Sequence, residues 1–166
     1  TIGDNSRRSL PVMGSSASLP GMNMQSLDRF VQEDSRRVRW SGAGTGRFGL
    51  YASERTDLSG FLNQQGALVM DVLMFRAPTA SVYLGMDCGQ DCDGELDITQ
   101  ALTDTAVKIP SGTWHTLALS LSCLAEQGVD LSLVLAPFYL STAGELDLAL
   151  HHIRIEPDTQ ANLACE

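Results

Sequence analysis

Short apolar runs separated by turn residues fill the chain from Ser26 onward. Along 37–41 and 80–86 the apolar residues alternate with polar or small ones, which is typical of strands with one buried face. The run 67–76 (ALVMDVLMFR) is apolar at both alternating sets of positions except for Asp71, a pattern typical of a strand covered on both faces. In 114–121 the leucines share one side, so this segment is also predicted to be a strand.

The last predicted strand, 145–155, changes its buried face along the way. Its first half places leucines on one side, and its second half places isoleucines on the other. Because a shift of one residue turns every following side chain over, we expect a β-bulge near His151–His152. In the apolar run 133–140, Pro137 lacks the N–H that a strand needs, so it is expected at a sheet edge or at a bulge.

Helical periodicity is weak, and single turns are expected near Thr99–Asp104 and Leu124–Gln127. About seven to nine strands with few helices predict an all-β fold, a two-sheet β-sandwich. Residues 1–25 are rich in Ser, Gly, Met and Pro without a sustained period, which predicts a linker or interdomain strap. We therefore expect a sandwich domain over residues 26–157 and a C-terminal tail over 158–166.

Composition narrows the functional classes. The 166 residues suffice for one domain with its own core. Eleven basic and twenty acidic residues give a net charge of −9, which disfavours non-specific nucleic-acid binding because that binding depends on cationic side chains. No apolar run approaches the roughly 20 residues that span a bilayer, so no membrane partner is expected. The chain starts at Thr1 without a signal peptide and is expected to be a piece of a longer or processed protein.

The four cysteines, Cys88, Cys92, Cys123 and Cys165, allow three complete pairings. Cys88 and Cys92 flank a predicted turn and form the favoured disulfide, although Cys123 paired with either of them would close a larger loop. Free thiols or a metal site are the alternatives, but this spacing is atypical of zinc ligands. A disulfide would place the protein in a periplasm or outside the cell.

One acidic turn is a weak candidate metal site, and the histidines are expected to be surface or edge residues with satisfied hydrogen bonds. Asp91, Asp93 and Glu95 alternate in an acidic turn and are candidate ligands of a structural calcium ion, although the turn departs from an EF-hand loop. We favour a solvated acidic turn, and no cofactor is expected. His151 and His152, as neighbours on a strand, point to opposite faces and would not bind one ion without the bulge.

One face of the predicted strands is not pure core. It combines flat aromatic rings with hydrogen-bonding groups, a mixture that suits a carbohydrate-binding cleft. The candidate carbohydrate-binding residues are Asp71, Phe75, Tyr83, Trp114, Asp147 and His151. Alternatively, this face docks on another domain, since a tryptophan at the start of a strand often packs beneath a loop. No motif of a serine hydrolase, zinc protease, P-loop or dinucleotide-binding protein is present, so no catalytic residue is predicted.

A series of motifs extends over residues 27–156. It comprises Leu27-Asp-Arg-Phe, Asp57-Leu-Ser59, Cys88-Gly-x-x-Cys92-x-Gly-x-Leu-Asp-Ile-Thr99, Gly112-x-Trp-x-Thr-Leu117, Leu121-Ser-Cys-Leu124, Ala136-Pro-Phe138 and Leu140-Ser-Thr-x-Gly144. In this order the motifs resemble the C-terminal galactose-binding-like domain of bacterial exo-β-glucosidases and glucan glucohydrolases of glycoside hydrolase family 3. Single motifs recur in many carbohydrate-binding sandwiches, whereas the whole series is more specific.

The resemblance implies a jelly-roll sandwich attached behind two catalytic domains, in a periplasmic or secreted bacterial enzyme that removes glucose from the ends of β-glucans. The catalytic nucleophile and acid of that family lie in the earlier domains, so this chain by itself is not expected to be an enzyme. Cys88, Cys92 and Cys123 match the family pattern, while Cys165 lies beyond it and its partner stays open.

Two functions follow from these observations, and a third is disfavoured. The favoured one is a non-catalytic accessory domain, similar to carbohydrate-binding modules, that binds β-glucan or gluco-oligosaccharides or guides them to the catalytic domains. The alternative is a purely structural domain that stabilises the catalytic domains without binding sugar. An independent small lyase or hydrolase is disfavoured because no constellation of catalytic residues is visible. The expected partners are therefore glucan and the catalytic domains of the parent enzyme.

Overall fold

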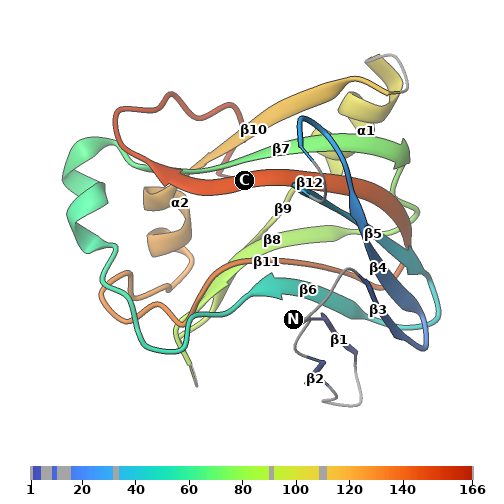
Figure 1. The fold of residues 1–166 in the computed structure, drawn as a ribbon. Coiled ribbons are helices and arrows are strands. Elements are labelled where there is room, and N and C mark those ends of the chain that lie inside the picture. The colour runs from blue at the N-terminus through green and yellow to red at the C-terminus, as the bar shows by residue number, and fades with distance from the viewer. Residues whose placement is uncertain are drawn as a thin grey trace.

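Over the residues that it describes, the computed structural model shows two six-stranded sheets stacked face to face (Figure 1). The structure describes residues 2–4, 9–10, 16–31, 34–89, 92–108 and 112–165. The strand pairings within both sheets are antiparallel. The predicted all-β sandwich is therefore confirmed.

The first sheet, called here the β11 sheet, has the strand order β2-β1-β6-β11-β8-β9. Its strands are β1 (Ile2–Asp4), β2 (Ser9–Leu10), β6 (Gly46–Leu50), β8 (Val82–Asp87), β9 (Gly94–Asp97) and β11 (Ala136–Thr142). The pairing of β11 with β8 shifts between Ala136 and Tyr139. Pro137 thus lies at a bulge of an inner strand, where its missing N–H breaks no regular ladder.

The second sheet, called here the β12 sheet, has the strand order β10-β7-β12-β5-β4-β3. Its strands are β3 (Ser16–Leu19), β4 (Met22–Leu27), β5 (Ser35–Ser41), β7 (Ala67–Arg76), β10 (Trp114–Ser120) and β12 (Glu145–Glu156). On the right of Figure 1, β5 and β4 run obliquely to β12, which is the neighbour of β5 in the sheet, so the sheet is twisted.

Strand β7 is buried on both faces over most of its length, as its apolar run predicted. The residues that point into the core between the sheets are Leu68, Met70, Val72 and Met74. On the outer side, Ala67 and Val69 pack with Ala118 of β10 in a second small apolar cluster. Only toward its end does the outer side open, and Phe75 is 40% exposed there.

Strand β12 contains the predicted bulge. The leucines of its first half lie in the core, and its register with β7 shifts between His151 and Arg154. The shift coincides with a left-handed backbone at His152, where φ is 50°. Beyond the bulge, Ile153 and Ile155 turn to pack against the core, so the change of face read from the sequence is confirmed.

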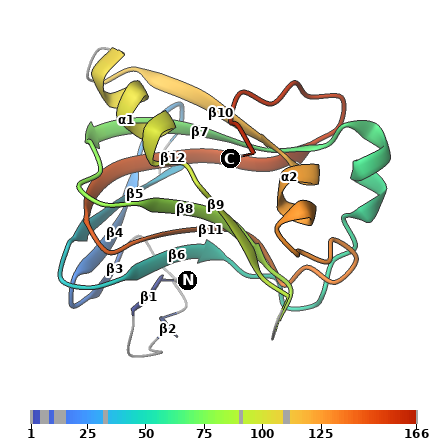
Figure 2. The same ribbon diagram turned by 180° about the vertical axis from the view of Figure 1, so that it is seen from behind.

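Short helices close the sandwich at its ends. Helix α1 (Thr99–Lys108) and helix α2 (Leu121–Glu126) lie at opposite ends, as both views show (Figures 1 and 2). A 3₁₀ helix, η1, covers Ser59–Gln64. The two predicted helical turns are therefore real, although α1 is longer than expected. Among the described residues, no helix is both long and apolar enough to cross a membrane.

The expected linker over residues 1–25 is wrong, because the described residues of its first half form β1 and β2 of the β11 sheet. Residues 16–19 and 22–27 are the strands β3 and β4, which extend the β12 sheet beyond β5. Met22 and Met24 are buried in the core, whereas Asn23 and Gln25 between them are exposed. This alternation is typical of a strand. Because it is short and lies among serines and glycines, the sequence by itself indicates a linker there. Residues 1, 5–8 and 11–15 lie outside the described residues.

The segment after β12 is packed rather than a free tail. Asn162 accepts a hydrogen bond from the Ala118 amide at 2.8 Å and donates one to the Thr116 carbonyl at 3.0 Å. Leu163 is buried, and Cys165 forms a disulfide with Cys123. The segment therefore follows β10, which is an edge strand, and pairs part of its exposed backbone.

Both disulfides join residues of the described chain. The favoured Cys88–Cys92 bond is present, and the partner of Cys123 is Cys165 rather than either of these two. Chain entropy makes the short loop worth roughly 2 kcal/mol and the longer one roughly 4 kcal/mol. The Cys123–Cys165 bond therefore stabilises the folded chain more than the Cys88–Cys92 bond does.

Candidate functional site

Five of the six predicted site residues lie on the outer face of the β12 sheet. Asp71 and Phe75 come from β7, Trp114 from β10, and Asp147 and His151 from β12. In an antiparallel sheet, directly opposite residues point to the same face. Trp114 lies opposite Leu73, and His151 lies opposite Asp71, so the registers bring these side chains together.

Tyr83 does not lie on this face, so the expectation that all six candidates share one face is wrong. It lies on β8 in the other sheet, opposite Asp97 and Ser141. Alternation predicts whether a side chain points outward, but it does not say to which sheet the strand belongs.

At one end of the face, Phe75 forms a group with Arg37, Asp147 and Arg39, called here the Phe75 unit. The guanidinium carbon of Arg37 lies 3.9 Å from the centre of the Phe75 ring. Arg37 also donates two hydrogen bonds to the Asp147 carboxylate, from Nε at 2.8 Å and from Nη2 at 2.7 Å. Arg39 donates a third from Nε at 3.1 Å. The ring and three polar side chains are thus held in fixed positions.

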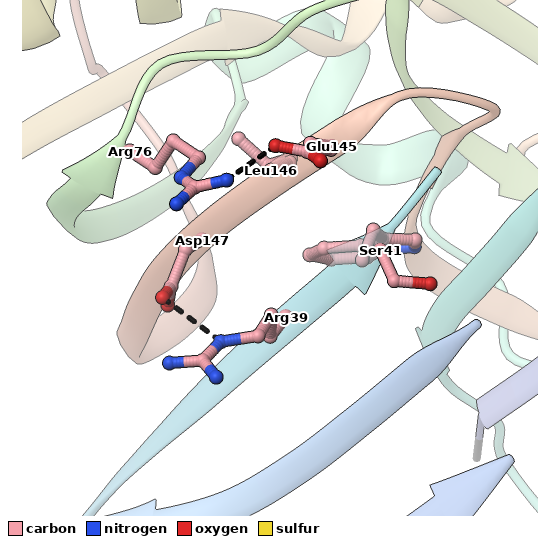
Figure 3. A pocket seen from close by; sticks show the side chains of 7 residues that line it. Arg39, Ser41, Arg76, Glu145, Leu146 and Asp147 are labelled. Carbon is pink, nitrogen blue, oxygen red and sulfur yellow. Dashed lines mark hydrogen bonds and ion pairs between the residues drawn. The ribbon is translucent and has the colours of Figure 1, made fainter. Parts of the chain in front are cut away.

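A pocket of about 260 Å³ adjoins the Phe75 unit (Figure 3). Its lining residues are Arg39, Trp40, Ser41, Arg76, Glu145, Leu146 and Asp147. The ion pair between Arg76 and Glu145 lies on one side, and the pair between Arg39 and Asp147 lies on the other. The side chains of Arg39 and Arg76 are 56% and 63% exposed, so their N–H groups are accessible to a ligand.

At the other end of the face, Trp114 forms a similar group with Arg29, Asp71 and His151, called here the Trp114 unit. The guanidinium carbon of Arg29 lies 4.5 Å from the centre of the Trp114 ring, and Arg29 forms an ion pair with Asp71. Arg29 Nη1 lies 2.9 Å from His151 Nδ1, and Thr116 donates to Asp71 at 2.7 Å. The side chains of Arg29, Asp71 and His151 are only 12–16% exposed.

The connection between β4 and β5 covers the Trp114 unit. Asp34 accepts hydrogen bonds from the backbone amides of Arg29, Phe30 and Val31. Burial by itself would raise the pKa of Asp34, but these amides outweigh it and hold the pKa far below its usual range. The Phe30 ring also packs on the Arg29 guanidinium at 4.6 Å, so this arginine contacts two aromatic rings.

The carboxylates of both units are ionised. Burial favours the neutral form of Asp71, but hydrogen bonds from Thr116 and Arg29 lower its pKa below the ordinary value. Burial acts in the same way on Asp147, and the hydrogen bonds of Arg37 and then Arg39 lower its pKa. Each negative charge is therefore matched by at least one guanidinium, which leaves a face that suits a neutral, hydroxyl-rich ligand better than a charged one.

The sequence reasoning missed the arginines of the site and Glu145. Arg37 and Arg39 alternate with the buried Val38 and Trp40, so the pattern of β5 contained the signal that they point outward. Arg29 carried no such signal, because it lies in an irregular connection whose position only the fold determines.

The outer face of the β11 sheet is filled by its own side chains. Tyr139 is buried there, and a Cβ added at Gly85 would lie only 2.4 Å from its ring. Arg47 stacks on this ring at 3.9 Å, and the hydroxyl donates to Glu95 at 3.1 Å. Burial is the main reason that the pKa of the Tyr139 hydroxyl is raised, so this hydroxyl stays protonated.

Of the calcium candidates, Glu95 is used in this hydrogen bond, and Asp91 lies outside the described residues. Within the described part of the chain, the cluster of three potential metal-ligating side chains is Asp71, His151 and His152 instead. A solvated acidic turn stays the expectation there, with a structural calcium ion as the alternative.

Comparisons with known proteins agree with this architecture. A family model described as galactose-binding domain-like, Exop_C, matches residues 1–155. The extra C-terminal domain of an exo-1,3/1,4-β-glucanase from a Pseudoalteromonas species is 23% identical and superposes with a TM-score of 0.72, over 94% of this chain and 83% of that one. In the structure of the exo-1,3/1,4-β-glucanase itself, the TM-score is 0.71, and the match covers 18% of that chain.

A second group of similar structures consists of carbohydrate-binding modules. The family 30 module of a cellulosomal cellulase from Clostridium thermocellum is 16% identical and has a TM-score of 0.67, over 96% of this chain and 91% of that one. At these identities the likeness concerns the fold. Among curated proteins, no match was found.

Proposed function

This chain belongs to the Exop_C family of galactose-binding-like domains, and from this premise we propose that it is a non-catalytic, glucan-binding accessory domain of an exo-acting β-glucanase. The similar domain in the Pseudoalteromonas glucanase supports the attachment to a hydrolase. The likeness to family 30 modules supports a role in saccharide binding. The parent enzyme would belong to glycoside hydrolase family 3, as the order of motifs implies.

The two disulfides support an oxidising location. Disulfides persist in a periplasm or outside the cell and are rare in the reducing cytosol. Polymeric glucan is also too large to enter a cell, so an enzyme that shortens it acts where the polymer is. We therefore propose a periplasmic or secreted parent enzyme.

The observation that carries the glucan-binding proposal is the Phe75 unit beside the pocket. A pyranose ring has apolar C–H groups on its faces and hydroxyls around its rim. Phe75 is an exposed ring for the first, and Arg39 and Arg76 offer N–H donors for the second. Glu145 and Asp147 offer acceptors on the same side. An apolar surface with a few fixed polar groups is the usual composition of a small-ligand site.

Calorimetric titration of the 166-residue chain with laminarin and cello-oligosaccharides tests the proposal. We expect binding heat with a measurable Kd. Phe75→Ala should weaken binding roughly ten-fold, because loss of a central aromatic contact costs on the order of 1–2 kcal/mol. Tyr83→Ala is the matched control, since Tyr83 is a partly exposed aromatic residue on the opposite sheet, and it should leave the Kd unchanged.

Absence of heat together with no retention on glucan affinity gels would overturn the proposal. An equal loss in the Phe75 and Tyr83 variants would move the site away from this face. If glucan does not bind, but removal of the domain lowers the melting temperature of the whole enzyme, the purely structural role holds instead.

A further inference from the structure

We infer that Asp71, His151 and His152 form a binding site for a divalent transition-metal ion such as Zn²⁺, in which the Arg29 guanidinium competes with the metal. One ligand atom from each of the three side chains lies within 4.8 Å of the others. The inference concerns the Trp114 unit, and it does not depend on glucan binding at the Phe75 unit.

The backbone of β12 is what brings the two histidines together. Neighbouring residues in a regular strand point to opposite faces, so their rings would lie on either side of the sheet. At the bulge, His152 adopts φ of 50°, and the centres of the two rings lie 5.7 Å apart. A left-handed conformation is uncommon for a residue other than glycine. The bulge therefore creates a pair of imidazoles that the strand pattern by itself excludes.

The donor set suits a transition metal. Two imidazole nitrogens and one carboxylate oxygen are ligands that zinc accepts in sites with one position left for water. Donor atoms on a tetrahedral zinc ion, with bonds of about 2.0–2.1 Å, lie about 3.3–3.5 Å apart, so the triad has to close by roughly 1–1.5 Å to hold the ion. His152 is exposed, so rotation of its side chain can bring its ring nitrogen nearer to the other two donors.

A further carboxylate orients His151. Its Nε2 lies 3.6 Å from Asp34 Oδ2, while its Nδ1 faces Asp71 at 3.5 Å. A metal-bound histidine commonly directs its second ring nitrogen at a carboxylate, which fixes the tautomer and strengthens the ligand. Asp34 is held ionised by the backbone amides that it caps, so this partner is present at neutral pH.

Arg29 occupies the position that a cation would take. Its Nη1 is hydrogen-bonded to Asp71 Oδ2 and lies 2.9 Å from His151 Nδ1, which are two of the three donor groups. A guanidinium does not lose its proton in proteins, so Arg29 and a metal ion exclude each other here. Binding of the metal would therefore move Arg29 away from Trp114, on which it now stacks.

Titration of the 166-residue chain with ZnCl₂, and with CoCl₂ followed by visible absorption, tests the site. His152→Ala should weaken Zn²⁺ binding at least about ten-fold, because even indirect partners of a metal contribute that much. His115→Ala is the matched control, since His115 is the other exposed histidine and lies outside the triad, and it should leave the affinity unchanged.

Arg29→Gln supplies the decisive direction. If Arg29 competes with the metal ion, its removal should tighten Zn²⁺ binding. If Arg29 has no part in the site, its removal should leave the Zn²⁺ affinity unchanged. Zn²⁺ should also change the fluorescence of the wild-type chain, and Trp114→Phe should abolish that change, because the other tryptophan, Trp40, is buried in the core. No binding by either wild type or Arg29→Gln, or equal weakening by His115→Ala and His152→Ala, would overturn the inference.

Discussion

The two ends of the outer face of the β12 sheet use the same three kinds of residue for different purposes. In each unit an arginine stacks on an aromatic ring and pairs with an aspartate. The Phe75 unit adjoins a pocket and leaves Arg39 more than half exposed. In the Trp114 unit the connection before β5 covers the arginine, and all of its ionic side chains are largely buried.

The difference shows that accessibility, and not residue type, separates a candidate ligand surface from a structural cluster. An arginine that is half exposed still offers N–H donors to a ligand. Arg29 contacts both Phe30 and Trp114, so those surfaces of its guanidinium are not available to a ligand. The covered unit, together with the exposed His152 beside it, forms the proposed metal site, in which Arg29 and the metal ion compete.

The largest expected contrast between the units is in stability. Asp71→Ala should lower the free energy of unfolding by about 3 kcal/mol, because it leaves the buried Arg29 without its partner. Asp147→Ala should cost only about 1–2 kcal/mol, since water reaches Arg39 and partly Arg37. Equilibrium unfolding in urea measures both values. Equal losses would show that the covered unit is no more buried in solution than the open one.

A contrast of intermediate size is expected in glucan affinity. Phe75→Ala should weaken binding roughly ten-fold, whereas Trp114→Ala should change it less than about three-fold, because Phe75 is exposed beside the pocket and Trp114 is partly buried in the covered unit. Titration of both variants with the same oligosaccharide gives the comparison. A larger loss in the Trp114 variant would reverse the assignment of the open and covered ends.

The smallest contrast is expected in the pH dependence of stability. The folded-state pKa values of Asp71 and Asp147 are lower than their unfolded values, which lie near 4. Their stabilisation is therefore fully present above about pH 5 and is lost as the pH falls through the folded-state pKa. Urea unfolding between about pH 6 and pH 3 should show a steep decline for wild type. Asp71→Asn and Asp147→Asn should each flatten it, and an unchanged slope would contradict the ionised pairs.

Much of the candidate site was accessible to sequence reasoning because it stands on strands. Alternation along β7 and β12 placed Asp71, Phe75, Asp147 and His151 on one side, and the leucine pattern placed the bulge at His151–His152. The same reasoning misplaced Tyr83, since a strand's alternation is identical in either sheet. Arg29 was out of reach because its contacts join residues 42 and 122 positions away in sequence.

The sequence by itself determined the all-β class, the inward and outward sides of most strands, the bulge in β12 and the order of motifs that marks the family. These features depend on local alternation, which a chain carries along its length. Only the tertiary structure decided that β3 and β4 join the β12 sheet, that Cys165 pairs with Cys123, and that the two units differ in exposure. Strand neighbours, disulfide partners and burial depend on distant segments meeting in space, and no local pattern encodes that meeting.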